Sequence, residues 1–188
     1  MQEIIFPLLT FLFGLIFGSF ANVCIYRLPK AKPFIWNRSF CPKCKKLINW
    51  YDNIPLTSYL VLNAKCRKCK KKIPKQYFLI ELISGLSFLF IYMTSYSLFA
   101  QAVLAFLFLT YLIIFFIDLK HFIIPDSLNF GLIIFAFVKN FFTDLNLNFT
   151  QDLEVSIIGG LVGYFSIWSI IQLYYILRKI EGMGLGDA

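Results

Sequence analysis

Residues 82–117 have the sequence LISGLSFLFIYMTSYSLFAQAVLAFLFLTYLIIFFI, and none of these 36 positions carries a charge. A helix of about 20 apolar residues crosses a bilayer, so this run is too long for a single crossing. We therefore predict a helical hairpin that turns near residues 94–97, with one helix at about 77–94 and the next at about 98–118. A polar turn of this kind, with Thr94 and Ser97, suits the tip of such a hairpin.

Three further segments have the length or the composition of membrane spans. Residues 4–26 and 155–177 are charge-free runs of 23 residues each, and residues 127–143 are interrupted only by Lys139, which can extend to the interface. Overall, 59% of residues are apolar and only 15% are charged, unlike a soluble domain. The fold class that we predict is an all-α polytopic membrane protein with about five transmembrane helices, at about 1–26, 77–94, 98–118, 126–143 and 155–177.

Glycines within two of these runs predict close helix packing. Gly14 and Gly18 lie four residues apart in the first run, and Gly159 and Gly163 have the same spacing in the last. Small residues at this spacing allow the backbones of two membrane helices to approach one another.

The distribution of basic residues predicts the orientation in the membrane. The net charge is +8, and 14 of the 18 Lys and Arg residues lie between residues 27 and 75, with Asp52 as the one acid among them. A basic block between apolar runs is typical of a cytoplasmic loop that meets anionic lipid headgroups, and it argues against nucleic acid as a partner. We therefore place residues 27–76 in the cytoplasm, the N-terminus outside, and the protein in the cytoplasmic (inner) membrane. The remaining flanks agree with this orientation: Asp144, Asp152 and Glu154 fall outside, and Lys120, Arg178 and Lys179 fall inside.

The basic loop holds two CxxC pairs, Cys41-Pro-Lys-Cys44 and Cys66-Arg-Lys-Cys69, which are separated by 21 residues. Two such pairs can supply four thiolates to one tetrahedral Zn²⁺, so we predict a structural zinc site. A redox-active pair would need only one CxxC and lacks its usual strand–helix context, and a reduced loop without metal is the remaining alternative. Cys24 lies alone in an apolar run and is expected to be a small core residue.

Two aspartates are candidates for catalysis at the membrane edge. Asp118 ends the third apolar run, where a carboxylate next to hydrocarbon is costly, and Asp187 ends the segment Gly182-Met-Gly-Leu-Gly-Asp187. The predicted orientation places both on the cytoplasmic edge. Two adjacent carboxylates share a proton, so that one can activate water while the other polarises a carbonyl group. Asp126 and Glu81 have a simpler interpretation as acids at helix starts.

The ordered set of motifs resembles the type IV prepilin peptidases, which are bifunctional membrane aspartyl proteases of the GxGD type. Residues 18–29 fit the opening pattern GxxxNxxIxRxP of that family, and the two CxxC pairs, Tyr77 and Glu81 follow at the family spacing. Residues 118–126 look like the first catalytic segment. Residues 184–187, Gly-Leu-Gly-Asp, look like the GxGD segment that carries the second catalytic aspartate.

The resemblance implies two reactions and their residues. An Asp118/Asp187 dyad would cut a basic leader from prepilins or pseudopilins at the cytoplasmic membrane face, within a protease region at 77–188. The new N-terminal residue would then be N-methylated from S-adenosylmethionine, an activity associated in this family with the zinc loop. Asn53, Tyr59 and Glu81 are the candidate residues for binding this methyl donor.

The family pattern usually continues into further helices past the GxGD segment, whereas this sequence ends at Ala188. The resemblance therefore predicts a C-terminally truncated member. Two alternatives follow from the same residues. One is a non-catalytic membrane module whose zinc loop docks a partner, and the other is a peptidase that lacks methyltransferase activity.

Overall fold

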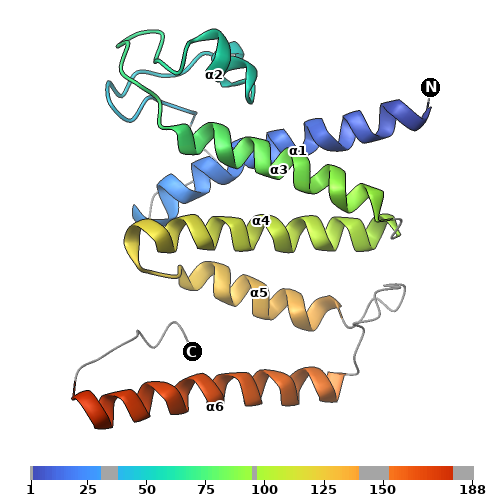
Figure 1. The fold of residues 1–188 in the computed structure, drawn as a ribbon, viewed down its shortest axis with the longest axis vertical. Helices are drawn as coiled ribbons and strands as arrows, with labels where there is room; N and C mark the ends of the chain where they lie inside the picture. Colours follow the sequence, from blue (N-terminus) through green and yellow to red (C-terminus); the bar gives the residue numbers. More distant parts are fainter. Residues whose placement is uncertain (1, 31–37, 95–96, 140–152, 180–188) are drawn as a thin grey trace. The chain divides into compact units, whose positions relative to one another are not determined.

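The computed structural model describes residues 2–30, 38–94, 97–139 and 153–179, and the regular structure of these residues is helical (Figure 1). Within these ranges, β pairing is limited to two isolated bridges, Phe40–Leu47 and Lys65–Lys72. The prediction of an all-α chain is thus confirmed. The helices are α1 (Gln2–Arg27), η1 (Leu28–Lys30), η2 (Trp50–Asn53), α2 (Thr57–Val61), α3 (Lys75–Met93), α4 (Leu98–His121), α5 (Asp126–Lys139) and α6 (Leu153–Arg178).

Four of these helices are long and apolar enough to cross a membrane, so the chain is a polytopic membrane protein. They cover Ile4–Lys30, Lys75–Met93, Leu98–His121 and Ile157–Leu177. The predicted helix at 126–143 is present as α5, but its 14 described residues are fewer than the roughly 20 that a bilayer requires. Residues 140–143 lie outside the described residues, so a fifth span stays a prediction.

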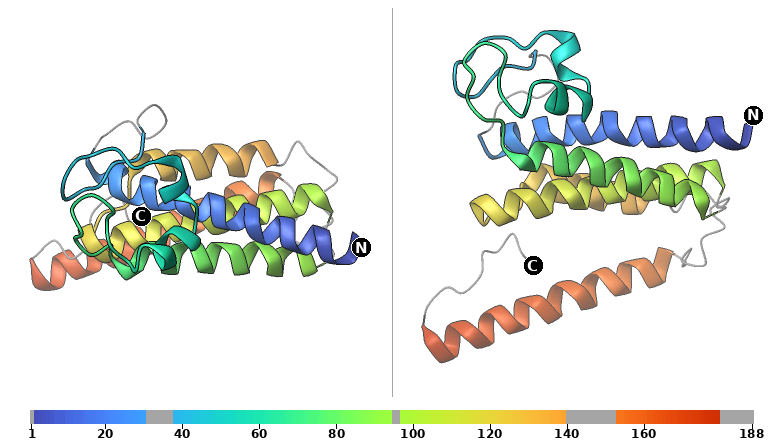
Figure 2. Two further views of the ribbon diagram at one scale, coloured as in Figure 1. Left: turned by 90° about the horizontal axis from the view of Figure 1, so that it is seen from above. Right: turned by 45° about the horizontal axis from the view of Figure 1, so that its top comes forward.

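The chain divides into two compact units, Met1–His121 and Phe122–Ala188, which we describe separately. In the first unit, α1, α3 and α4 pack together and the cysteine loop lies over the start of α3 (Figure 1). The views in Figure 2 show that α1 crosses α3, while α3 and α4 form a helical hairpin. The hairpin turns between Met93 and Leu98, as the charge-free run predicted.

The crossing of α1 and α3 depends on glycines that leave room for the opposing backbone. A Cβ atom on Gly14 would lie 2.6 Å from the carbonyl oxygen of Ser84, and one on Gly18 would lie 2.8 Å from the Ser84 Cβ. Neither distance is sterically allowed, so only glycine fits at both positions. The prediction of close packing in the first span is therefore confirmed. At Gly159 a new Cβ would meet no described atom within 4 Å, and close packing in the last span stays a prediction.

The outward faces of the helices carry large apolar side chains. Phe13, Phe90 and Phe115 are each more than half exposed, and the buried positions on the same helices include Ala21, Ile80 and Ile117. Helices that are apolar on the outside as well as inside suit a surrounding of lipid chains.

Replacement of Gly14 by valine is expected to destabilise the first unit. The new side chain would meet the backbone oxygen of Ser84, which cannot rotate away, and overpacking of this kind costs about 1–3 kcal/mol or prevents folding. Thermal unfolding of the purified protein in detergent should show a clear fall in the midpoint. Gly159→Val introduces the same side chain into a helix where nothing described obstructs it and should change the midpoint much less. Equal midpoints for the two variants would contradict this description of the crossing.

Candidate functional site

Each CxxC pair folds into the same tight turn. The amide of Cys41 donates to the carbonyl of Lys46 at 3.0 Å, and the amide of Lys45 donates to the carbonyl of Cys41 at 2.8 Å. In the second pair, the amide of Cys66 donates to Lys71 and the amide of Lys70 to Cys66, both at 2.9 Å. The two turns are therefore equivalent and direct their cysteines inward in the same way.

Both turns require a residue with positive φ just after the second cysteine. Lys45 and Lys70 occupy these positions, with φ values of 58° and 57°. A side chain in this left-handed region costs about 1–3 kcal/mol, and such a conformation persists where its surroundings enforce it. Metal binding by the adjacent cysteines would supply that constraint.

The four sulfur atoms of Cys41, Cys44, Cys66 and Cys69 lie within 4.8 Å of one another and are positioned to bind a metal. The Sγ atoms of Cys41 and Cys69 are 3.9 Å apart. Tetrahedral zinc with Zn–S bonds of about 2.3 Å places its sulfur ligands about 3.8 Å apart, so the cluster fits a zinc ion with little adjustment. Four soft thiolate donors also match the preference of Zn²⁺ in structural sites.

Two thiols of the cluster have pKa values shifted in opposite directions. The backbone amide of Cys69 is the main cause that lowers the pKa of Cys66 to about 7, against the opposing effect of burial. The backbone amide of Lys71 acts to lower the pKa of Cys69, but burial and the three neighbouring thiols together outweigh it and raise this pKa to about 11. Four thiolates at this separation repel one another, and a divalent cation removes that repulsion.

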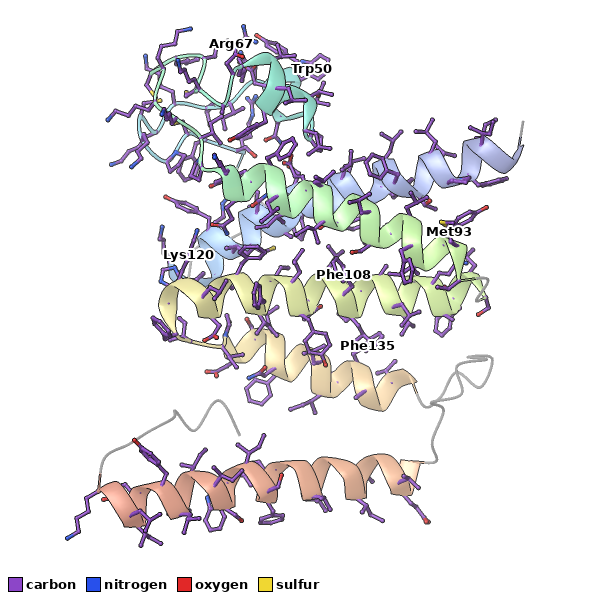
Figure 3. All side chains as sticks on the ribbon, viewed as in Figure 1. Trp50, Arg67, Met93, Phe108, Lys120 and Phe135 are labelled. Carbon is purple, nitrogen blue, oxygen red and sulfur yellow. The ribbon has the colours of Figure 1, made fainter. Side chains whose placement is uncertain are left out.

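An ion pair joins the second turn to the helical segment η2. The Nε atom of Arg67 donates to Asp52 Oδ2 at 2.9 Å, and its Nη2 atom donates to Oδ1 at 2.7 Å. The guanidinium group also lies over the ring of Tyr51, 5.5 Å from its centroid. Figure 3 shows Arg67 and the neighbouring Trp50 on this loop. In the sequence, Asp52 stood out only as the one acid of a basic loop. Its ion pair with Arg67, 15 residues away, was not predicted.

A cavity of about 200 Å³ lies between α1, α3 and the cysteine loop. Its lining is largely apolar, but three polar side chains in its wall are more than nine-tenths buried: Asn22, Arg27 and Glu81. Asn53 and Tyr59 also line it, so the structure brings together all three residues that the resemblance proposed for methyl-donor binding. Asn22 and Arg27 were visible in the sequence only as letters of the opening motif, without a role.

Hydrogen bonds fix the polar groups of the cavity wall. The side chain of Asn22 donates to the carbonyl of Tyr77 at 3.1 Å, and Nη2 of Arg27 donates to the carbonyl of Arg38 at 3.2 Å. Oε2 of Glu81 accepts a hydrogen bond from the amide of Leu56 at 2.9 Å. The first of these contacts joins α1 to α3, and the other two tie the loop to these helices.

The structure describes one of the two aspartates that are proposed for catalysis. Asp118 is exposed in the last turn of α4, and Asp187 lies outside the described residues. The last turn of α4 carries Lys120, which Figure 3 shows at the opposite end of the hairpin from Met93. This end is also the one at which α3 and the cysteine loop meet (Figure 1). Asp126 begins α5, as expected for an acid at a helix start. The same expectation for Glu81 is wrong, because α3 begins at Lys75 and has no acid in its first turn.

Comparison with known proteins gives matches over both halves of the sequence. Residues 12–95 match the bacterial peptidase A24 N-terminal domain, and residues 105–188 match the type IV leader peptidase family. A prepilin leader peptidase/N-methyltransferase of Vibrio cholerae is 36% identical, over 99% of this chain and 75% of the relative. Proteins of the same description from Pseudomonas aeruginosa and Stutzerimonas stutzeri are 34% and 35% identical, each over 97% of this chain and 69% of the relative. No solved structure matches the chain.

Replacement of Cys69 by serine is expected to remove most of the bound zinc, because a hydroxyl group is a much poorer ligand than a thiolate. Elemental analysis of purified protein should give about one zinc per chain for the unmodified protein and far less for the variant. Cys24→Ser is the matched control, since Cys24 is buried in α1 away from the cluster and its loss should leave the zinc content unchanged. Full zinc content in Cys69→Ser would contradict the four-cysteine site.

Proposed function

The chain belongs to the type IV leader peptidase family, and we propose that it cleaves the leader peptides of prepilins or pseudopilins and then methylates the new N-terminus. The observation that carries this proposal is the identity of 36%, over nearly the whole chain, with a prepilin leader peptidase/N-methyltransferase. Two carboxylates can hydrolyse a peptide without a covalent nucleophile, and such a site needs no histidine as its base. This mechanism suits a chain with a single histidine, His121.

For cleavage, we assign the two carboxyl groups to Asp118 and Asp187. One carboxylate takes a proton from water as the oxygen attacks the scissile carbonyl carbon, while the protonated partner donates a hydrogen bond to the carbonyl oxygen. Collapse of the tetrahedral intermediate breaks the C–N bond, and the proton passes to the leaving amine. Two observations support the assignment: both residues lie in the segment that matches the leader peptidase family, and Asp118 is exposed in the last turn of α4.

The cleavage site is proposed to face the cytoplasm, at the inner membrane. The basic loop, the start of α3 and the end of α4 share one end of the first unit, and positively charged loops stay on the cytoplasmic side. On this basis residues 1–26 form the first span, residues 27–76 the cytoplasmic zinc-binding loop, and residues 77–188 the protease region. Lipid headgroups would be the immediate neighbours of the loop's many lysines.

For methylation, the proposed donor is S-adenosylmethionine. The relatives named as bifunctional enzymes resemble the chain over both halves, and the match to the N-terminal peptidase domain covers the whole cysteine loop. The four-cysteine cluster has all its ligands from protein, so zinc there would fold the loop rather than take part in the reaction.

Replacement of Asp118 by asparagine is expected to reduce leader cleavage by about 10²- to 10⁴-fold, because an amide can neither accept the proton from water nor share one with Asp187. The assay is the shift in mass of a prepilin substrate incubated with the protein in lipid nanodiscs. Glu154→Gln is the control: it makes the same change from acid to amide at the exposed start of α6 and should leave cleavage unchanged. Cleavage by Asp118→Asn at the unmodified rate would reject the dyad.

A further inference from the structure

The segment before α2 contains a strained turn. Leu56 has φ 57° and ψ −52°, and the amide of Thr57 donates to the carbonyl of Pro55 at 2.6 Å. A hydrogen bond across three residues with positive φ at the centre is a rare form of γ-turn, and it is unfavourable for a residue with a side chain. Such a backbone persists only where other contacts enforce it.

A buried carboxylate enforces this turn. The amide of Leu56 donates to Oε2 of Glu81, a residue in the second turn of α3 whose exposure is only 8%. The carboxylate of Glu81 also interacts with the hydroxyl of Ser19 on α1. A hydrogen bond from an amide to a carboxylate is stronger than one between neutral groups, and this one connects positions 25 residues apart. The turn is thereby fixed to both α1 and α3.

The turn forms part of the cavity wall. Asn53 and Ile54 precede it, Ser58 and Tyr59 follow it, and all four line the cavity together with Glu81. Strained backbone gathers at sites where a ligand must be held in one geometry, and a largely apolar cavity with a few buried polar groups is the usual form of a small-molecule site. The position of this segment and its strained backbone therefore both indicate a role in holding a small molecule in the cavity.

The chemistry of the wall suits a ligand with separated charges. Tyr26, Phe40, Tyr59 and Tyr77 contribute aromatic rings, which attract cations such as a sulfonium group. On the side of the loop, the ammonium groups of Lys43 and Lys46 line the wall and suit a carboxylate. S-adenosylmethionine carries a sulfonium group, an amino acid carboxylate and an apolar purine face.

We propose that this cavity is the methyl-donor site and that Glu81 is a positioning residue, which acts through the Leu56 turn to hold the segment from Asn53 to Tyr59 against the donor. The inference rests on the methylation proposed above. It adds the location of the donor site and the hydrogen bond that holds the wall of that site in place. In the transfer, the lone pair of the neutral substrate amine bonds to the methyl carbon. The C–S electron pair stays on sulfur, which becomes a neutral thioether, and the methylated ammonium releases one proton to solvent.

The first test compares two substitutions of Glu81 in the full-length protein in nanodiscs. Glu81→Ala removes the acceptor for the Leu56 amide, so we expect methylation kcat/KM to fall about 10- to 100-fold, with a raised KM for S-adenosylmethionine. Glu81→Gln keeps a carbonyl oxygen that can accept the same hydrogen bond and should restore most of this loss. Zinc content and leader cleavage are measured on the same samples, because a protein that is merely unfolded would lose these as well.

The second test changes the donor of the hydrogen bond. Leu56→Pro has no amide hydrogen and a φ fixed near −65°, so it should reduce methylation as Glu81→Ala does. Leu56→Gly keeps the amide and adopts positive φ without strain, so its methylation should stay within about threefold of the unmodified protein. Because Glu81→Ala and Leu56→Pro break the same bond, the double variant should lose little more than either single variant.

The outcomes separate this inference from the proposed function. Methylation at the unmodified rate by Glu81→Ala, with cleavage and zinc intact, would overturn the inference and leave the bifunctional activity standing. Additive losses in the double variant would also overturn it, because the two residues would then act independently. If the unmodified protein cleaves but neither methylates nor binds radiolabelled S-adenosylmethionine, both the methylation and its site are rejected while the peptidase assignment remains.

Discussion

The close crossing of α1 and α3 is the contact on which the rest of the first unit depends. A Cβ on Gly18 would lie 2.9 Å from the Cα of Glu81, so the two backbones meet at the second turn of α3. This proximity fixes the depth of the Glu81 carboxylate beside Ser19. Since Glu81 in turn holds the amide of Leu56, the helix crossing determines where the loop attaches to the membrane helices.

The loop itself requires constraints of its own, because it has little apolar core. Within it, Cys41 is buried, while the other three cysteines of the cluster are partly exposed. The four thiols gather the two turns into one site, and the ion pair between Asp52 and Arg67 joins η2 to the second turn. The binding free energy of a structural zinc ion is folding free energy for such a segment. Removal of the metal is therefore expected to disturb the cavity, whose wall includes Cys41 and Cys66.

Much of the fold follows from patterns that are local in the sequence. Charge-free runs predicted the four long apolar helices and the hairpin between Met93 and Leu98, and the spacing of Gly14 and Gly18 predicted a close crossing. The convergence of the four cysteines followed from the two CxxC pairs. Each of these features depends on a residue pattern with one usual structural role: charge-free runs form membrane helices, glycines four residues apart allow close helix packing, and paired CxxC motifs bind metal.

The cavity and its strained turn depend instead on contacts that no local pattern encodes. Leu56 is an ordinary apolar residue, and nothing near it in the sequence indicates positive φ, which Gly or Asn would have done. The sequence suggested that Glu81 was an acid at a helix start, and that interpretation gave no sign of its bond to Leu56. The pairing of Asp52 with Arg67 likewise needs the fold of the loop, because many basic residues were available as partners.

We propose that cleavage uses Asp118 and Asp187 and that methyl transfer takes place in the cavity between α1, α3 and the cysteine loop, so the two reactions should be separable. The most direct measurement is mass spectrometry of a synthetic peptide that corresponds to a pilin N-terminus already free of its leader. Incubated with S-adenosylmethionine and Asp118→Asn, this peptide should gain the mass of one methyl group as fast as with the unmodified protein. A peptide that the unmodified protein methylates and Asp118→Asn leaves unchanged would contradict the separation of the two sites.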